Sequence, residues 1–134
     1  PLPTPEGAIG AVADLLIDMH GGRVTESAGR RCIVAVPGSD LLLEEPDDSA
    51  DAVRVCTRIG ERHHKQDELR LRIEAMQPRV DPQYRIDHAE GSYGWDVTMD
   101  TTLDTSDELA CHDALWAFLQ VAEELRPALT PWGS

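Results

Sequence analysis

Three aspartates, Asp96, Asp100 and Asp104, follow one another at four-residue spacing, and grouped carboxylates are the usual protein ligands of calcium. Apolar residues alternate with them from Trp95 to Met99, which predicts a strand with Asp96 and Asp100 on one face. Carboxylates four residues apart on a strand lie about 13 Å apart, too far to share one ion. The glycine-containing loop of calcium-binding motifs is absent from the sequence. A solvated sheet face is therefore the favoured interpretation, with no metal site.

An acid–base pair is the second chemistry to consider, because Asp87 and His88 are adjacent and Tyr84 precedes them at alternating spacing. On a strand, however, Asp87 and His88 point to opposite faces. The sequence contains no GxSxG, HExxH, P-loop or GxGxxG motif. We therefore expect no catalytic residues and no bound cofactor, and we predict that the protein is not an enzyme.

Histidines and cysteines form no pattern typical of zinc sites. The adjacent His63 and His64 diverge in either a helix or a strand, and Cys111-His112 has no Cys or His four residues on. Three separated cysteines argue against a disulfide framework and favour buried free thiols in a reducing compartment; they are Cys32, Cys56 and Cys111. His20, near the apolar side of the first predicted helix, is expected to be a core or capping histidine.

Trp116 is the most informative single residue, because it projects about 140° from the centre of the apolar stripe of the last predicted helix. Its neighbours on that side are mostly polar: Leu109, His112, Gln120 and Glu123. A large aromatic on a polar face is a candidate anchor for a partner protein or for a second copy of the chain. The alternative is that Pro131 and Trp132, or a loop, cover it. We predict a partner-binding surface of Trp116, Leu109, His112 and Glu123.

The charge is unevenly distributed along this 134-residue chain of net charge −13. Residues 1–51 carry −7 and residues 86–134 carry −9, whereas residues 52–85 carry +3. A protein with this large negative charge is repelled by the phosphates of nucleic acid, so we expect no direct binding to it. The arginines of the middle segment are expected to pair with acidic faces of the same chain or of a second subunit. The prevalence of Arg over Lys is typical of a G+C-rich genome, and the acidity is either functional or shared by the organism's proteins.

The chain is expected to be one domain over residues 1–134, with an apolar fraction of 41% typical of a globular protein. No apolar run reaches the roughly 20 residues of a membrane span, and no signal peptide is recognised, so we expect a cytoplasmic protein. Thr4 and Pro5 are expected to start a helix that Gly21-Gly22 ends, with Ile9, Val12 and Leu16 on its buried face.

Strands are predicted for residues 24–27, 31–36 and 41–43, and a hairpin for residues 84–88 and 93–99. Residues 49–64 are ambiguous: Val53, Val55, Thr57 and Ile59 alternate as in a strand, but a helix capped by Ser49 is favoured. Residues 69–74 are predicted as a strand. Thr105 and Glu108 match a capping box, which predicts a last helix with a long apolar stripe: Cys111, Leu115, Phe118, Ala122 and Leu125. The fold class is α+β: an antiparallel sheet of five to six strands, flanked by N- and C-terminal helices and a middle helix.

The order of elements, the acidity and the run from Gly94-Trp95-Asp96-Val97 through Thr105 into the last helix resemble the type III secretion chaperone-like fold. This fold includes the YbjN-like proteins of bacteria. The sequence departs from the pattern at residues 69–92, and no residue role is carried over. The resemblance implies a non-catalytic protein that binds another protein and commonly forms a homodimer.

We therefore expect an acidic protein-binding module, such as a chaperone, an adaptor or an immunity-type protein, that holds a partner, possibly a basic one. One alternative is an inhibitor that mimics nucleic acid and occupies the basic groove of a DNA- or RNA-binding protein. Another is a small-ligand binding domain or enzyme, with a pocket around Tyr84, His88, Tyr93 and Trp95. A tightly filled interface between sheet and helices would count against that pocket.

Overall fold

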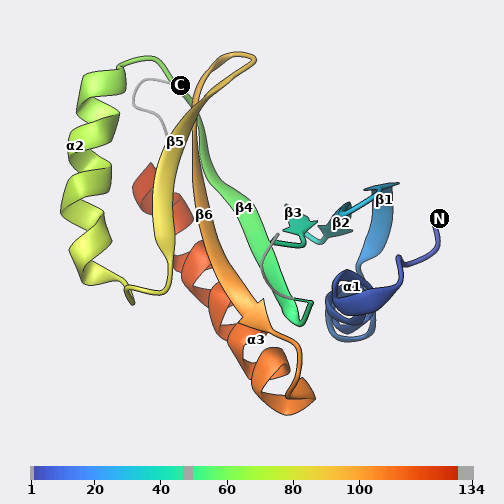
Figure 1. Cartoon of the computed structure of the whole chain (residues 1–134). Helices are drawn as coiled ribbons and strands as arrows, with labels where there is room; N and C mark the ends of the chain where they lie inside the picture. Colours follow the sequence, from blue (N-terminus) through green and yellow to red (C-terminus); the bar gives the residue numbers. More distant parts are fainter. Residues whose placement is uncertain (1, 47–49, 130–134) are drawn as a thin grey trace.

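A six-stranded antiparallel sheet and three helices make up the computed structural model, which describes residues 2–46 and 50–129 (Figure 1). The strands lie in the order β1-β2-β3-β4-β6-β5. In chain order the elements are α1 (Gly7–His20), β1 (Arg23–Ala28), β2 (Arg31–Val36), β3 (Ser39–Glu44), β4 (Ala52–His63), α2 (Gln66–Met76), β5 (Arg85–Gly91), β6 (Gly94–Asp104) and α3 (Glu108–Leu125). The predicted α+β class and the N- and C-terminal helices are confirmed.

Helix α1 buries the apolar face predicted for it: Ile9, Val12, Ala13 and Leu16. It ends at Gly21, which adopts the left-handed conformation (φ 64°) that glycine accommodates without strain. The predicted start is wrong, because the helix begins at Gly7 after Glu6, whose side chain makes no capping hydrogen bond. The residues before it are extended instead, and Leu2 forms a bridge with Val24 of β1.

Strands β1, β2 and β3 form the predicted meander of sequential neighbours. The register pairs Val34 of β2 with Leu41 of β3, and both side chains are fully buried. A bulge interrupts β1 between Val24 and Glu26, and it twists this edge strand away from regular pairing.

In the middle of the chain the favoured predictions of helix and strand are both wrong. Residues Ala52–His63 form the long central strand β4, and the middle helix is α2, Gln66–Met76, where a strand was expected. Alternate residues of β4 from Val53 to Ile59 are buried, as the rejected strand interpretation requires. In α2 only Leu69 and Ile73 are buried, at helical i, i+4 spacing, while Leu71 between them is 64% exposed. Ser49, the expected cap, lies outside the described residues.

The β5–β6 hairpin is confirmed, and the side chain of Gln77, just after α2, protects its outer edge. Gln77, which follows α2, donates from Nε2 to the Tyr84 carbonyl (2.8 Å). Its Oε1 accepts from the Ile86 amide (2.8 Å). The side-chain amide thus takes the place of a neighbouring strand and satisfies backbone groups at the edge of the sheet.

Helix α3 follows β6 and buries Cys111, Leu115, Phe118 and Ala122 from the predicted stripe. The predicted capping box is wrong. Asp107 is the N-cap and accepts from the Ala110 amide (3.2 Å), whereas the Thr105 hydroxyl donates to the Asp51 carbonyl (2.8 Å). β6 runs on to Asp104, so the turn into the helix comes two residues later than predicted.

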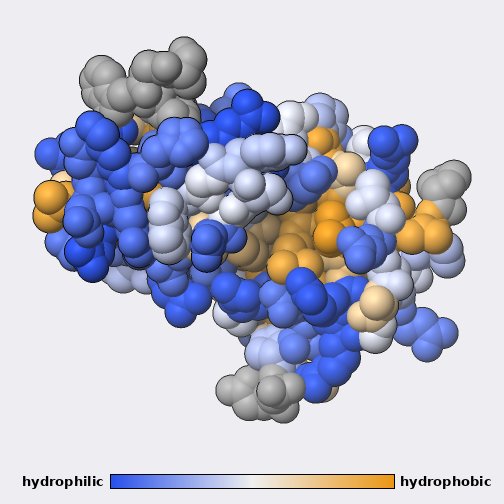
Figure 2. All heavy atoms as spheres, turned by 90° about the horizontal axis from the view of Figure 1, so that it is seen from above, coloured by the Kyte–Doolittle hydropathy of each residue, from blue (hydrophilic) through white to orange (hydrophobic). Residues whose placement is uncertain are grey.

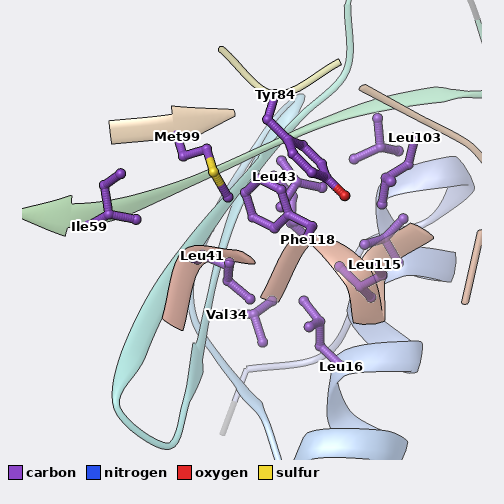
Figure 3. Close-up of a cluster of buried hydrophobic side chains, with 14 of the residues drawn as sticks. Leu16, Val34, Leu41, Leu43, Ile59, Tyr84, Met99, Leu103, Leu115 and Phe118 are labelled. Carbon is purple, nitrogen blue, oxygen red and sulfur yellow. The ribbon is translucent and has the colours of Figure 1, made fainter. Parts of the chain in front are cut away.

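All three helices pack on one face of the sheet. Buried side chains from α1, α2 and α3 join those of the strands in one core, and Figure 3 shows Phe118 at its centre with Leu16, Tyr84 and Leu115 around it. Tyr84 packs edge-on against Phe118, with ring centroids 5.8 Å apart. Gln66 of α2 reaches His88, which shares a side of β5 with the buried Ile86 (Nε2–Nε2 distance 3.5 Å). This places α2 on the same side as α1 and α3.

The opposite face of the sheet, which we call the open face, carries no helix in the part of the chain that the structure describes. Alternation places Ile33, Leu42 and Cys56 on it, and the register sets these half-buried residues side by side across β2, β3 and β4. Figure 1 shows α1 below β1–β3, so the view from above looks onto the other side of these strands. Figure 2 shows a hollowed apolar patch there, surrounded by hydrophilic residues.

Candidate functional site

The four residues predicted to bind a partner lie along the exposed side of α3. Trp116 is 49% exposed and Leu109 is 72% exposed, the latter among the largest values for an apolar side chain here. His112 is half-exposed, with Nδ1 3.4 Å from Asp113 Oδ1, and Glu123 is exposed. The structure brings Trp116 and Glu123 to one cavity, whereas Leu109 and His112 lie one to two turns earlier on the same side of the helix. We call these four residues the α3 stripe.

Trp116 does not project freely, because its ring stacks on His20 at the end of α1. The ring centroids are 5.5 Å apart and the planes differ by 24°. The Nε2 atom of His20 is buried and has no hydrogen-bond partner among the described residues. The expectation of an ordinary capping or core histidine therefore missed its contact with Trp116, since helical periodicity within α1 says nothing about a neighbouring helix. The alternative cover for Trp116, Pro131 and Trp132, lies outside the described residues.

A cavity of about 330 Å³ opens beside this stack, between the end of α1, the β2–β3 turn and α3. Trp116, Gln120 and Glu123 line it from α3, and Pro37 and Ser39 line it from the turn. Arg126, just after α3, donates from Nη2 to the Ser39 hydroxyl (2.8 Å) and so ties the helix end to the turn. The cavity therefore has an aromatic wall, a carboxylate and several hydrogen-bonding groups, a combination suited to holding a side chain of a partner.

The surface around the cavity is acidic because α1 and α3 contain no lysine or arginine. The two helices carry six carboxylates, from Asp14, Asp18, Glu108, Asp113, Glu123 and Glu124. Their only other ionisable side chains besides the Cys111 thiol are His20 and His112.

On the open face, unlike on α1 and α3, the carboxylates have arginine partners. The arginines of the middle segment pair with carboxylates of neighbouring strands. Arg54 bridges Glu44 and Asp100, with N–O distances of 3.1 Å to each. Arg85 adds a second contact to Asp100 (3.5 Å). Burial alone would lower the pKa of Arg54, but the hydrogen bond and the charge of Asp100 outweigh it, so the pKa is raised.

Asp96, Asp100 and Asp104 belong to this open face, but the prediction of a uniformly solvated row is wrong. Asp100 is only 8% exposed because Arg54 and Arg85 cover it. Asp104 stays exposed, and hydrogen bonds from the Ser106 hydroxyl and amide lower its pKa. Asp96 lies 3.7 Å from Arg58. Within residues 2–46 and 50–129 no three His, Cys, Asp or Glu side chains are grouped to hold a metal ion.

The residues considered for a small-ligand pocket or acid–base chemistry do not converge. Tyr84 is buried against Phe118, whereas Tyr93 is 74% exposed and lies 5.7 Å from the Arg62 guanidinium. His88 packs near Trp95, with ring centroids 5.4 Å apart. His88 lies on the Ile86 side of β5 and Asp87 is exposed, but the Asp87 carboxylate turns back to accept a hydrogen bond from the His88 amide (2.8 Å), which leaves Oδ1 3.6 Å from His88 Nδ1. Tyr84 belongs to the packed core and Trp95 packs against it, in the region where that pocket was expected.

One further contact could not be recognised from spacing. His63 is buried, and its Nε2 lies 2.7 Å from the Leu129 carbonyl, which holds the segment after α3 against β4, while His64 is exposed. The three cysteines are free, as predicted; Cys32 and Cys111 are buried and Cys56 is half-buried, and burial raises the pKa of each thiol. No described helix is both long and apolar enough to cross a bilayer.

The chain has no match among protein-family models, curated proteins or solved structures. The resemblance to the type III secretion chaperone-like fold therefore stays a prediction.

Proposed function

We propose that this protein is a non-catalytic, acidic protein-binding module whose α1–α3 surface holds a basic partner protein. The observation that supports this proposal is the α3 stripe itself. It presents an exposed leucine and a half-exposed tryptophan on a helical layer that carries six carboxylates and no lysine or arginine.

The two parts of this surface have different physical roles. Carboxylates around the stripe attract a basic partner and orient it during association, an effect mainly on the association rate. Trp116 and Leu109 then supply apolar area to bury, and tryptophan is among the residues that most often dominate binding energy. The cavity beside Trp116 would accept an aromatic or apolar side chain, with Glu123 and Arg126 among its lining residues.

A cytoplasmic location fits this proposal, because the chain carries three free thiols and two of them are buried. The homodimer implied by the resemblance is a separate prediction. The base-free α1–α3 layer also favours one second candidate, an inhibitor that mimics nucleic-acid phosphates. In that case the partner would be a DNA- or RNA-binding protein, and the protein would compete with DNA for it.

Selection from a random-peptide display library with the purified protein tests the proposal. We expect enriched peptides that combine Lys or Arg with one large apolar residue and that lose affinity in 1 M salt, where screening is nearly complete. Binding should disappear with Trp116→Ala and persist with Tyr93→Ala, an aromatic control on the distant β5–β6 turn. Enrichment of acidic peptides, or peptides indifferent to Trp116→Ala, would contradict the proposal.

A further inference from the structure

A cavity of about 680 Å³ forms a groove between the α2 side and the α3 side of the helical layer. It does not include the α3 stripe, and the contacts that carry the proposed function play no part in it. Its shape, its apolar floor and its charges indicate a specific occupant.

One wall of the groove follows α2 into the 3-10 turn Gln77–Arg79. Arg72, Ala75, Met76 and Arg79 line it, which are positions i, i+3, i+4 and i+7. Residues at this spacing share one side of a helix. Met76 is half-buried and packs against the core, whereas Ala75 is exposed.

The other wall has the same periodicity on α3 and the 3-10 turn that follows it. Val121, Glu124, Leu125 and Ala128 line it, again at i, i+3, i+4 and i+7. Val121 and Leu125 are half-buried against the core, and Ala128 is exposed. Two helical surfaces with this spacing form the ridges and holes that receive the side chains of a third helix.

We propose that this groove binds an amphipathic helix of a partner protein, with an acidic edge facing α2 and a basic edge facing α3. Each wall spans seven residues, or about 10 Å of helix, so the contact covers about two turns of the incoming helix. The partner helix therefore needs apolar residues at i, i+3, i+4 and i+7, the spacing of helix-in-groove recognition.

Charge complementarity sets the orientation of the occupant. Arg72 and Arg79 stand at the two ends of the α2 wall, and Glu124 stands on the α3 wall. Asp81 also lines the groove beside Arg79 and accepts a hydrogen bond from the Gln83 amide (3.1 Å). With its charge counted, the α2 side of the groove is +1 (Arg72 and Arg79 against Asp81), and the α3 wall is −1 from Glu124. Exposed ion pairs add little affinity. We therefore expect the apolar floor to determine whether a helix binds and the charged edges to determine which way it lies.

The test uses the full chain and three synthetic peptides in NMR titrations. The matched peptide is an amphipathic helix with Leu at i, i+3, i+4 and i+7, Glu along one edge and Lys along the other. A second peptide exchanges the two charged edges, and a third is a scrambled sequence of the same composition. We expect the matched peptide to bind with a dissociation constant on the order of 10 µM and to shift the signals of Met76, Val121 and Leu125. The edge-exchanged peptide should bind about fivefold more weakly.

Three variants at exposed positions test whether the binding occurs in the groove. Ala75→Trp places a large ring at an exposed position of the wall and should weaken the matched peptide at least tenfold. Ala110→Trp makes the same change at an exposed position in the first turn of α3, outside the groove, and should leave binding unchanged. Arg79→Glu should reduce the preference between the matched and edge-exchanged peptides.

Several outcomes would overturn the inference. They are equal binding of the matched and scrambled peptides, no saturable binding at all, and signal shifts confined to the surroundings of Trp116. Displacement of the peptide by laurate at lower concentration would indicate a site for small apolar ligands. Self-association of the wild-type chain that Ala75→Trp abolishes would assign the groove to a second copy. Loss of basic-peptide binding in Trp116→Ala bears only on the proposed function.

Discussion

The ion pair between Arg54 and Asp100 should contribute measurably to the stability of the fold, unlike most surface pairs. Its N–O distance is 3.1 Å, and the side chains are 35% and 11% exposed, so both groups are partly shielded from water. A hydrogen bond between charged groups contributes roughly 1.5–3 kcal/mol when shielded and less when exposed. We expect a coupling free energy of about 1–2 kcal/mol for this pair.

A double-mutant cycle measures this coupling. Arg54→Met removes the guanidinium but keeps the aliphatic stem, and Asp100→Asn removes the charge at nearly constant shape. Unfolding free energies of the wild type, both single variants and the double variant come from urea denaturation. The cycle separates the pair from the additional contacts of Arg54 with Glu44 and of Asp100 with Arg85.

Arg58 and Asp96 provide a matched control on the same open face. Their N–O distance is 3.7 Å, and the Arg58 side chain is 57% exposed. Coupling between Arg58→Met and Asp96→Asn should therefore be at most about 0.5 kcal/mol. A coupling at Arg54–Asp100 that is no larger than this control would refute the argument that shielding strengthens the first pair.

Three further predictions concern the core, the turn before α3 and the sheet edge. Phe118→Ala leaves a cavity beside Tyr84 and should lower the unfolding free energy by about 3–5 kcal/mol in urea denaturation, and a loss under 1 kcal/mol would contradict the packing. Asp104→Asn should destabilise the protein at pH 7, and this loss should disappear in acid. A carboxyl pKa that is lower in the folded state stabilises the fold above the ordinary carboxyl pKa, and the stabilisation is lost as the pH falls through the folded-state pKa. An unfolding difference that does not depend on pH would refute that assignment. Gln77→Ala should speed hydrogen exchange of the Ile86 amide at least tenfold, because the edge strand loses its substitute partner; unchanged exchange would show that Gln77 does not protect this edge.

The elements that the sequence predicted well are those whose burial has a single strong period. The buried residues of α3 recur at helical spacing and those of β2, β3 and β6 alternate, so each pattern indicates the type of its element. The boundaries were predicted less closely, since β6 extends to Asp104 and α3 begins at Glu108. The expectation that arginines of the middle segment pair with carboxylates of the same chain is also confirmed for Arg54, Arg58 and Arg70.

The sequence interpretation of β4 was wrong because the segment carries conflicting signals. It is longer than a usual strand, and it contains Gly60, which is unusual inside a helix. The register shifts on both sides of Gly60, and Arg62 has a positive φ of 62°. A Cβ at Gly60 would lie 3.0 Å from Leu129 Cβ, so a residue of the 3-10 turn Arg126–Leu129, far along the chain, accounts for this glycine. Contacts between distant segments of this kind leave no periodic signal in the sequence.

α2 was assigned wrongly for a related reason. Leu69, Leu71 and Ile73 alternate as in a strand, but Asp67 and Glu68 occupy a first helical turn, where acidic residues are favourable. Met76 extends the i, i+4, i+7 series of Leu69 and Ile73, and that signal could have identified the helix. For the candidate site, the exposure of Trp116 was predicted, but its stacking on His20 was not, because it depends on how two helices meet.

The central claim, that the α1–α3 surface binds a basic partner through Trp116, is tested most directly by isothermal titration of a display-selected basic peptide. A tryptophan contributes roughly 200 Å² of contact area, and about half of it is exposed here, so burying the remainder is worth about 2.5 kcal/mol. Trp116→Ala should accordingly weaken the peptide about 30- to 100-fold while Tyr93→Ala changes its affinity less than threefold. Equal affinities of the wild type and Trp116→Ala, with both proteins folded, would contradict the claim.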